Sequence, residues 1–214
     1  MRKLIPISLA LIIAALFALN LDQIISLWFD GTARDSWRHF ALDITDIGLA
    51  EQWFFLAALT MLFTSLSLRY KPQSINREKL LNLNRWSQYF FCSLMVSGFF
   101  LQLTKICFGR QRPHISLDRN PLVFHPFNLN WDFQSFPSGH TQTLFTVASL
   151  FIVLWPKQAK IIWFAAGALA FTRVMALQHF VSDLIGGALI GIYASQLTFW
   201  LLRKKIPEPQ AYTQ

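Results

Sequence analysis

The segment Phe136–His140, with the sequence Phe-Pro-Ser-Gly-His, is polar and runs directly into the apolar stretch Thr141–Trp155. A glycine beside a serine at the start of a helix leaves backbone N–H groups free to bind an anion, and the helix dipole adds partial positive charge there. Phosphate is the obvious anion. His140 is then placed to protonate the group that leaves the phosphate, because histidine changes charge near neutral pH. The alternative is that Ser138 is an ordinary helix N-cap.

Three cations stand at the ends of other apolar segments. Lys105 and Arg112 close one such segment, and Arg173 closes another. A cation within a helix end in a membrane costs about 2.5–3.5 kcal/mol unless it has a partner or water. Each cation, taken singly, is explained by a side chain that extends to the lipid headgroups. Three cations brought to one face instead indicate a bound anion.

The composition is that of an integral membrane protein. Of the 214 residues, 54% are hydrophobic and 14% are charged, which is unlike a soluble domain. A net charge of +8 is also found in nucleic-acid-binding proteins, but in a membrane protein the basic residues usually mark the cytoplasmic side. We therefore expect the bilayer as a partner, and no nucleic acid.

The chain is predicted to be all-α: a single domain, residues 1–214, folded as a bundle of six transmembrane helices. Its first apolar run lacks a small-residue cleavage site, so we expect an uncleaved helix rather than a signal peptide. Gly187 and Gly191 form a small-residue face suited to close helix contact. The six predicted spans are Leu4–Trp28, Trp53–Leu68, Ser87–Phe108, His140–Trp155, Ile161–Ala176 and Phe180–Leu202.

Two further segments are predicted to lie at the membrane surface. Phe29–Gln52 has apolar residues at helical spacing, which indicates a short amphipathic helix at the interface. Gly109–Gly139 is a long loop, since its prolines rule out a spanning helix, and its aromatic residues suit the headgroup layer. The apolar stripe of the amphipathic helix is Trp37, Phe40, Ile44 and Ile47.

The distribution of charge predicts the orientation of the bundle. With the N-terminus in the cytoplasm, twelve of the nineteen basic residues fall on the inner side, and nine of the eleven acidic residues fall on the outer side. This positive-inside bias predicts that both termini are cytoplasmic. The residues of the anion site then share the outer face.

The two cysteines, Cys92 and Cys107, lie fifteen positions apart in one apolar segment. That separation along a helix is too large for a mutual disulfide. We expect free, buried thiols without a redox or metal role.

Three short motifs occur in a fixed order along the chain. They are Lys105-x6-Arg112-Pro113, Pro137-Ser138-Gly139-His140 and Thr172-Arg173-x5-His179-x3-Asp183. Together they resemble the signature of the type 2 phosphatidic acid phosphatase family, in both order and spacing. One position departs from the family pattern: Thr172 replaces a serine and keeps its hydroxyl. The motifs occupy residues 105–183, and the six-helix layout extends the likeness over nearly the whole chain.

The resemblance implies a metal-independent phosphatase without a cofactor that works through a phosphohistidine. His179 would be the nucleophile, with a neutral imidazole. Asp183, four residues further on, can accept from the other ring nitrogen and fix its tautomer. His140 would protonate the leaving oxygen and later deprotonate water. The phosphoryl oxygens would be held by Lys105, Arg112, Ser138, the Gly139 N–H and Arg173.

Several alternatives remain open at this point. His140, His179 and Asp183 are also types that bind zinc, although the neighbouring cations argue against a metal. The same polar cluster could instead line the substrate path of a lipid transporter or scramblase. The remaining residues of interest are His39, His114 and His125, expected to be solvated or interfacial, and Arg110 and Arg119, expected at a second phosphate or a headgroup.

The sequence therefore predicts a phosphohydrolase in the inner membrane of a bacterium, with its site at the outer face. The predicted partner is a lipid phosphate, and no obligate protein partner is inferred. Candidate substrates within the family are undecaprenyl pyrophosphate, phosphatidylglycerol phosphate, phosphatidic acid and the phosphates of lipid A. A phosphotransferase that passes the phosphoryl group from His179 to another lipid is the alternative.

Overall fold

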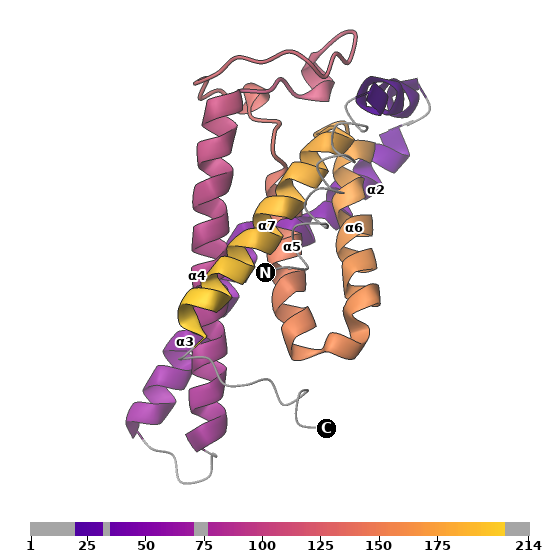
Figure 1. Ribbon diagram of the computed structural model, residues 1–214. Coiled ribbons are helices and arrows are strands. Elements are labelled where there is room, and N and C mark those ends of the chain that lie inside the picture. Colours follow the sequence, from indigo (N-terminus) through magenta and orange to yellow (C-terminus); the bar gives the residue numbers. More distant parts are fainter. Residues whose placement is uncertain (1–19, 32–34, 71–76, 204–214) are drawn as a thin grey trace.

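The computed structural model describes residues 20–31, 35–70 and 77–203 of the chain (Figure 1). Most of the predicted first span lies outside these residues, although 20–31 are helical. The described part is all-helical apart from one isolated bridge between Arg110 and Phe124. The α-helices are α2 (Asp35–Thr45), α3 (Ala50–Tyr70), α4 (Arg77–Phe108), α5 (Gly139–Leu154), α6 (Ala159–Met175) and α7 (Val181–Leu202). Four 3-10 turns join them: η1 (Asp46–Gly48), η2 (Pro113–Ile115), η3 (Trp131–Phe133) and η4 (Pro156–Gln158).

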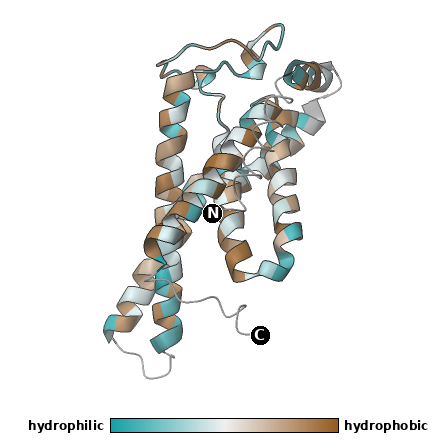
Figure 2. Ribbon diagram, viewed as in Figure 1, coloured by the Kyte–Doolittle hydropathy of each residue, from teal (hydrophilic) through white to brown (hydrophobic). Residues whose placement is uncertain are grey.

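Three helical stretches within the described residues are long and apolar enough to cross a membrane. They are Arg38–Tyr70, which runs from α2 through η1 to the end of α3, Arg77–Phe108 (α4) and Val181–Leu202 (α7). The apolar helix α5 is shorter, at 16 residues. Large apolar side chains such as Phe55, Phe99 and Phe164 point outward, 69%, 65% and 78% exposed. Figure 2 shows hydrophilic residues gathered in the long loop and at the lower ends of α3 and α4. This distribution suits a bundle surrounded by hydrocarbon, and the count of six spans stays a prediction.

Helix α4 begins at Arg77, ten residues before the predicted start at Ser87. The polar stretch ahead of Ser87 was not included in the predicted span. Within it, the Asn84 side-chain amide donates to Thr64 Oγ1 at 2.7 Å, so the stretch packs against α3 as a helix. The last three helices begin and end within two residues of their predicted bounds.

The predicted amphipathic helix corresponds to α2, which packs against α6. Its buried face carries Ala41 and Thr45, whereas Phe40 and Ile47 of the predicted apolar stripe are about half exposed, at 54% and 49%. These two residues of the stripe thus face away from the bundle, as a helix in contact with lipid requires, whereas Ile44 is partly buried. The Trp37 side chain lies outside the described part.

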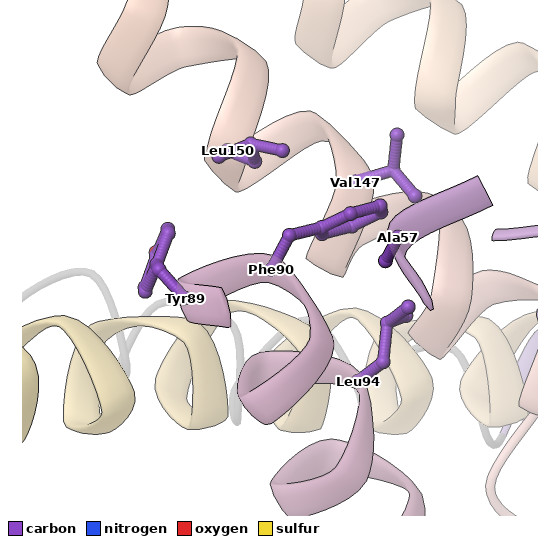
Figure 3. Packing of buried hydrophobic residues seen from close by; sticks show 6 residues of the cluster. All are labelled: Ala57, Tyr89, Phe90, Leu94, Val147 and Leu150. Carbon is purple, nitrogen blue, oxygen red and sulfur yellow. The ribbon is translucent and has the colours of Figure 1, made fainter. Parts of the chain in front are cut away.

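Two hydrophobic clusters meet on α5. One joins α3, α4 and α5 through residues such as Ala57, Phe90 and Val147 (Figure 3). The other joins α5 to α6 and α7. Helix α5 is therefore the central element, and its start, which carries Ser138 and His140, is held from both sides.

The predicted small-residue face of α7 is confirmed. A Cβ added at Gly187 would lie 2.4 Å from the Ser138 carbonyl oxygen, and one at Gly191 would lie 2.5 Å from that of Gln142. Only glycine lets the two backbones approach so closely. This contact fixes the start of α5 against the start of α7.

Candidate active site

The residues of the three motifs come from four helices and two connecting loops that meet at one end of the bundle, the upper end in Figure 1. Lys105 lies in the last turn of α4, Arg173 in the last turn of α6, and Asp183 in the first turn of α7. His140 is the second residue of α5. Arg112 and His179 lie in the connecting loops.

The long loop 109–138 is fastened to the end of α4, which fixes the position of Arg112. Gly109 ends the helix with a φ of +59°, and a Cβ there would collide with the His125 carbonyl oxygen at 1.7 Å. The His125 N–H donates to Gly109 O at 2.7 Å, and the Phe127 N–H donates to Ile106 O at 2.7 Å. The sharp turn therefore depends on the glycine.

Arg112 is buried and clamped in a fixed orientation. Its guanidinium lies 3.6 Å from the centre of the Trp131 ring, and its Nε donates to Trp131 O at 3.0 Å. Burial, and then the nearby Arg173, lowers the pKa of Arg112 to about 10. The side chain therefore remains a cation at neutral pH, and such a stacked arginine is suited to bind an anion.

His179 lies between Arg112 and Asp183 and is 2% exposed. Its Nε2 is 3.4 Å from Arg112 Nη1, and its Nδ1 is 3.5 Å from Asp183 Oδ2, an ion-pair distance longer than an ordinary hydrogen bond. Burial, and then Arg112, holds the pKa of His179 well below its usual range, so the ring is neutral at pH 7. Because a guanidinium only donates, this arrangement places the lone pair on Nε2 and the proton on Nδ1.

Asp183 is fully buried, and its carboxylate accepts hydrogen bonds from three donors. Oδ2 accepts from Ser135 Oγ at 2.6 Å and from the Phe180 N–H at 2.8 Å. Oδ1 accepts from Arg110 Nη1 at 2.5 Å. Donors on both oxygens keep the carboxylate ionised and hold it beside His179.

Arg110 was predicted to contact a second phosphate or a headgroup, and that prediction is wrong. The side chain is 1% exposed and pairs with two carboxylates, Asp183 and Asp22, the latter at 3.0 Å. Arg119 is likewise bound to protein atoms: it donates to the carbonyls of Pro113 and Ser116 and pairs with Asp30 at 2.8 Å. One signal had been available for Asp22, since an acid inside an apolar segment needs a partner.

Three cations act on His140. Lys105, Arg112 and Arg173 all interact electrostatically with its ring. Lys105 donates to the Gln134 carbonyl, whereas Nε of Arg173 has no hydrogen-bond partner among the described residues. The ring of His140 packs on Gly48, where an added Cβ would lie 3.1 Å from it. Lys105 and Arg112 therefore act on both histidines, and Arg173 acts on His140.

Ser138 and Gly139 lie at the start of α5, as its N-cap and its first residue. Ser138 is fully buried and its side chain caps the helix by accepting from the Thr141 N–H, as the N-cap alternative required. Gly139 has free space, since a Cβ there would meet only Leu101 Cδ2, at 3.4 Å. Contact of either residue with a phosphate stays a prediction.

Other predicted features turn out as follows. His39 and His125 are exposed, as expected. His114 is half-buried, 3.7 Å from Asp132, and burial, followed by Arg112, lowers its pKa. Both cysteines are free, but neither is fully buried as predicted: Cys92 is partly buried and Cys107 is exposed.

The zinc alternative requires His140, His179 and Asp183 to converge as ligands. Among the described residues, no three histidine, cysteine or acidic side chains are grouped closely enough to hold a metal ion. Asp183 instead directs its carboxylate to Arg110 and Ser135.

Residues 86–207 match the family model of the PAP2 superfamily. The chain is 36% identical over 110 residues to the lipid A 1-phosphatase of Rhizobium johnstonii, covering 51% of this chain and 45% of that one. It is 31% identical over 153 residues to the lipid A 1-phosphatase of Rhizobium etli, covering 71% and 66%. It therefore aligns with about half to two thirds of these relatives' length.

The fold is also similar to a solved structure. The crystal structure of Aquifex aeolicus LpxE superposes with a TM-score of 0.59 at 20% identity, over 84% of this chain and 95% of that one.

Proposed function

Since this chain belongs to the PAP2 superfamily, we propose that it is a membrane phosphatase that removes a phosphate group from a lipid. The observation that carries the proposal is the setting of His179. Its neutral ring presents Nε2 to a cationic cluster, while Asp183 lies beside Nδ1. A neutral imidazole oriented by a carboxylate, next to groups that bind a phosphoryl anion, is suited to nucleophilic attack on phosphorus.

In the first step, Nε2 of His179 attacks phosphorus and the bond between phosphorus and the lipid oxygen breaks. His140, as an imidazolium, gives its proton to the leaving oxygen. The Asp183 carboxylate stabilises the positive charge that develops on the His179 ring. The products of this step are the lipid alcohol, or the lipid monophosphate from a pyrophosphate, and a phosphohistidine.

In the second step, water attacks the phosphohistidine and His140 takes the proton from that water. The bond between phosphorus and Nε2 breaks, inorganic phosphate leaves, and both histidines regain their starting protonation states. Lys105, Arg112 and Arg173 neutralise the phosphoryl oxygens in both steps, together with Ser138 and the Gly139 N–H. The three cations oppose a charged His140, so a bound phosphate dianion favours its protonation.

The substrate we favour is the 1-phosphate of lipid A, because both Rhizobium relatives carry that activity in their names. The site lies at one end of an apolar bundle, where a lipid can bring its phosphate while its chains stay in the bilayer. The charge distribution supports an inner-membrane location with cytoplasmic termini and a site at the outer face. Transfer to an acceptor lipid instead of water is the alternative that uses the same phosphohistidine.

The proposal is tested by phosphate release from a panel of purified lipids in detergent, with and without a strong chelator. The panel contains lipid A with both phosphates, phosphatidic acid, phosphatidylglycerol phosphate and undecaprenyl pyrophosphate, and His179→Ala protein is the blank. We expect release from lipid A first, unaffected by the chelator. Loss of lipid phosphate without free phosphate indicates transfer, and no reaction with any of the four lipids favours the transporter alternative.

A further inference from the structure

Arg110 lies between two carboxylates in the interior of the bundle. Its Nη1 donates to Asp183 Oδ1 at 2.5 Å and its Nη2 to Asp22 Oδ2 at 3.0 Å. Ser182 bridges the same groups, since its hydroxyl accepts from Arg110 Nη1 at 2.7 Å and donates to Asp22 Oδ2. Arg110 is 1% exposed, and the two acids are 0% exposed. The first described helix, residues 20–31, is thereby joined to the carboxylate beside His179.

The charges of this trio explain why two acids are present. A lone Arg110 beside Asp183 would cancel the negative charge that a developing imidazolium at His179 needs. Asp22 adds a second negative charge, so that the trio as a whole carries −1. Both oxygens of Asp22 act as acceptors: Oδ1 from the Ser182 N–H at 3.0 Å, and Oδ2 from Arg110 and the Ser182 hydroxyl. This pattern fits an ionised carboxylate.

We propose that Asp22 and Arg110 are positioning residues for the phosphoryl transfer, which hold Asp183 in place and keep the Asp22–Arg110–Asp183 trio net negative toward His179. The inference rests on the proposed function, in which His179 is the nucleophile. Neither residue touches the reacting atoms. They act through Asp183, as the groups behind a metal ligand or a catalytic histidine do.

Charged groups of several described elements act on this arrangement. His179 faces Arg112, Lys105 and Asp183. Asp183 faces Arg110 and His179 most closely. Asp22 faces Arg110 and the more distant Asp183. Removal of the Asp22 charge therefore makes a positive His179 ring less favourable, and Asp183 is the one acid among the described residues that acts directly on that ring.

The test compares Asp22→Asn with Asp30→Asn in the purified full-length protein. Asp30 is a matched control, because it lies in the same helix and pairs with a loop arginine, Arg119, at 2.8 Å, without contact to Asp183. The probes are lipid A with both phosphates and dioleoyl phosphatidic acid. We expect Asp22→Asn to lower kcat about 10- to 100-fold with KM unchanged, and Asp30→Asn to leave both unchanged.

The pH profile separates positioning from a merely structural effect. Asp22→Asn should move the acid limb of kcat/KM to lower pH, because the ring of His179 is then harder to protonate. A variant that only folds poorly should keep the acid limb at the same pH and show a lower kcat/KM at every pH. In an Asp183→Asn background, Asp22→Asn should not lower kcat any further, because Asp22 acts on His179 through the Asp183 carboxylate.

If Asp22→Asn is recovered only unfolded, Ser182→Ala decides, since it removes the bridging hydroxyl and keeps all three charges. We expect a lower kcat with the acid limb unmoved and the melting temperature of the wild type, which excludes poor folding as the cause, and a wild-type kcat would overturn the inference. A wild-type kcat and pH profile for a folded Asp22→Asn would also overturn it. Wild-type protein that cleaves neither probe would instead refute the proposed function, and the inference with it.

Discussion

The backbone N–H of Ser138 donates to the backbone carbonyl of Asp183 at 3.0 Å, so that helices α5 and α7 begin at the same point. One helix brings His140 to this joint and the other brings the carboxylate beside His179. The geometry of the site therefore depends on how closely these two helices pack. This dependence leads to the first prediction.

Gly187→Ala should lower both stability and activity. The added methyl would lie 2.4 Å from the Ser138 carbonyl oxygen, so that the two helices must separate. We expect a loss of roughly 1–3 kcal/mol in unfolding free energy, read as a lower melting temperature, together with a reduced kcat. Gly98→Ala is the matched control, because nothing lies within 4 Å of a Cβ at that helical glycine. Equal melting temperatures for the two variants would contradict the close contact.

His179→Ala should abolish turnover of any lipid that the wild type hydrolyses, because no other described group lies in its place to attack phosphorus. A loss of at least 10³-fold in kcat is expected for removal of a nucleophile. His125→Ala, an exposed loop histidine, should retain wild-type activity. Appreciable turnover by folded His179→Ala protein would refute the assigned role.

The stability of the protein should depend on pH through His179. The pKa of its buried ring is lowered in the folded state, whereas the unfolded ring keeps a value near 6.5. The unfolded chain thus binds the extra proton first, and the stability present above about pH 6.5 is lost as the pH falls below it. Melting temperatures at pH 7 and pH 5 should differ less for His179→Gln than for the wild type. An equal difference would assign the effect to other groups.

Gly139→Ala should weaken substrate binding without lowering the stability of the fold. The methyl would meet only Leu101 Cδ2 at 3.4 Å, an ordinary contact, so the melting temperature should not fall. It would, however, occupy space at the helix start where we expect the phosphate. We predict a raised KM or a reduced kcat/KM of about tenfold or more, by analogy with lost oxyanion contacts. Wild-type kinetics would place the phosphate elsewhere.

The orientation can be tested with single cysteines in a background that lacks Cys92 and Cys107. Leu117→Cys lies in the fully exposed part of the long loop, and Lys157→Cys lies in the exposed turn between α5 and α6. A membrane-impermeant maleimide applied to spheroplasts should label Leu117→Cys and not Lys157→Cys. The reverse pattern would place the site on the cytoplasmic side.

The elements of the second half could be predicted from the sequence because their apolar runs have clear limits. Helix α5, for example, ends beside Pro156, which cannot continue a helix. The start of α4 at Arg77 could not, because polar residues such as Asn84 become helical only through α3. Local pattern carries no information about such a partner.

The candidate site, too, could be predicted from the sequence only in part. The spacing of His179 and Asp183 on the chain already indicates that the two side chains are neighbours. The role of Arg110 was missed, since one of its partners, Asp22, lies 88 positions away. A long-range pair of this kind leaves no periodicity in the sequence, apart from an acid in an apolar run.

The link from Asp22 to the start of α7 also sets an order of events during synthesis. Asp22 leaves the ribosome 160 residues before Ser182, its hydrogen-bond partner. At roughly 5–20 residues per second, it waits on the order of ten seconds or longer for the start of α7. A nascent chain therefore lacks the Asp22–Ser182 link, and with it the Asp183 carboxylate beside His179, until α7 has been made.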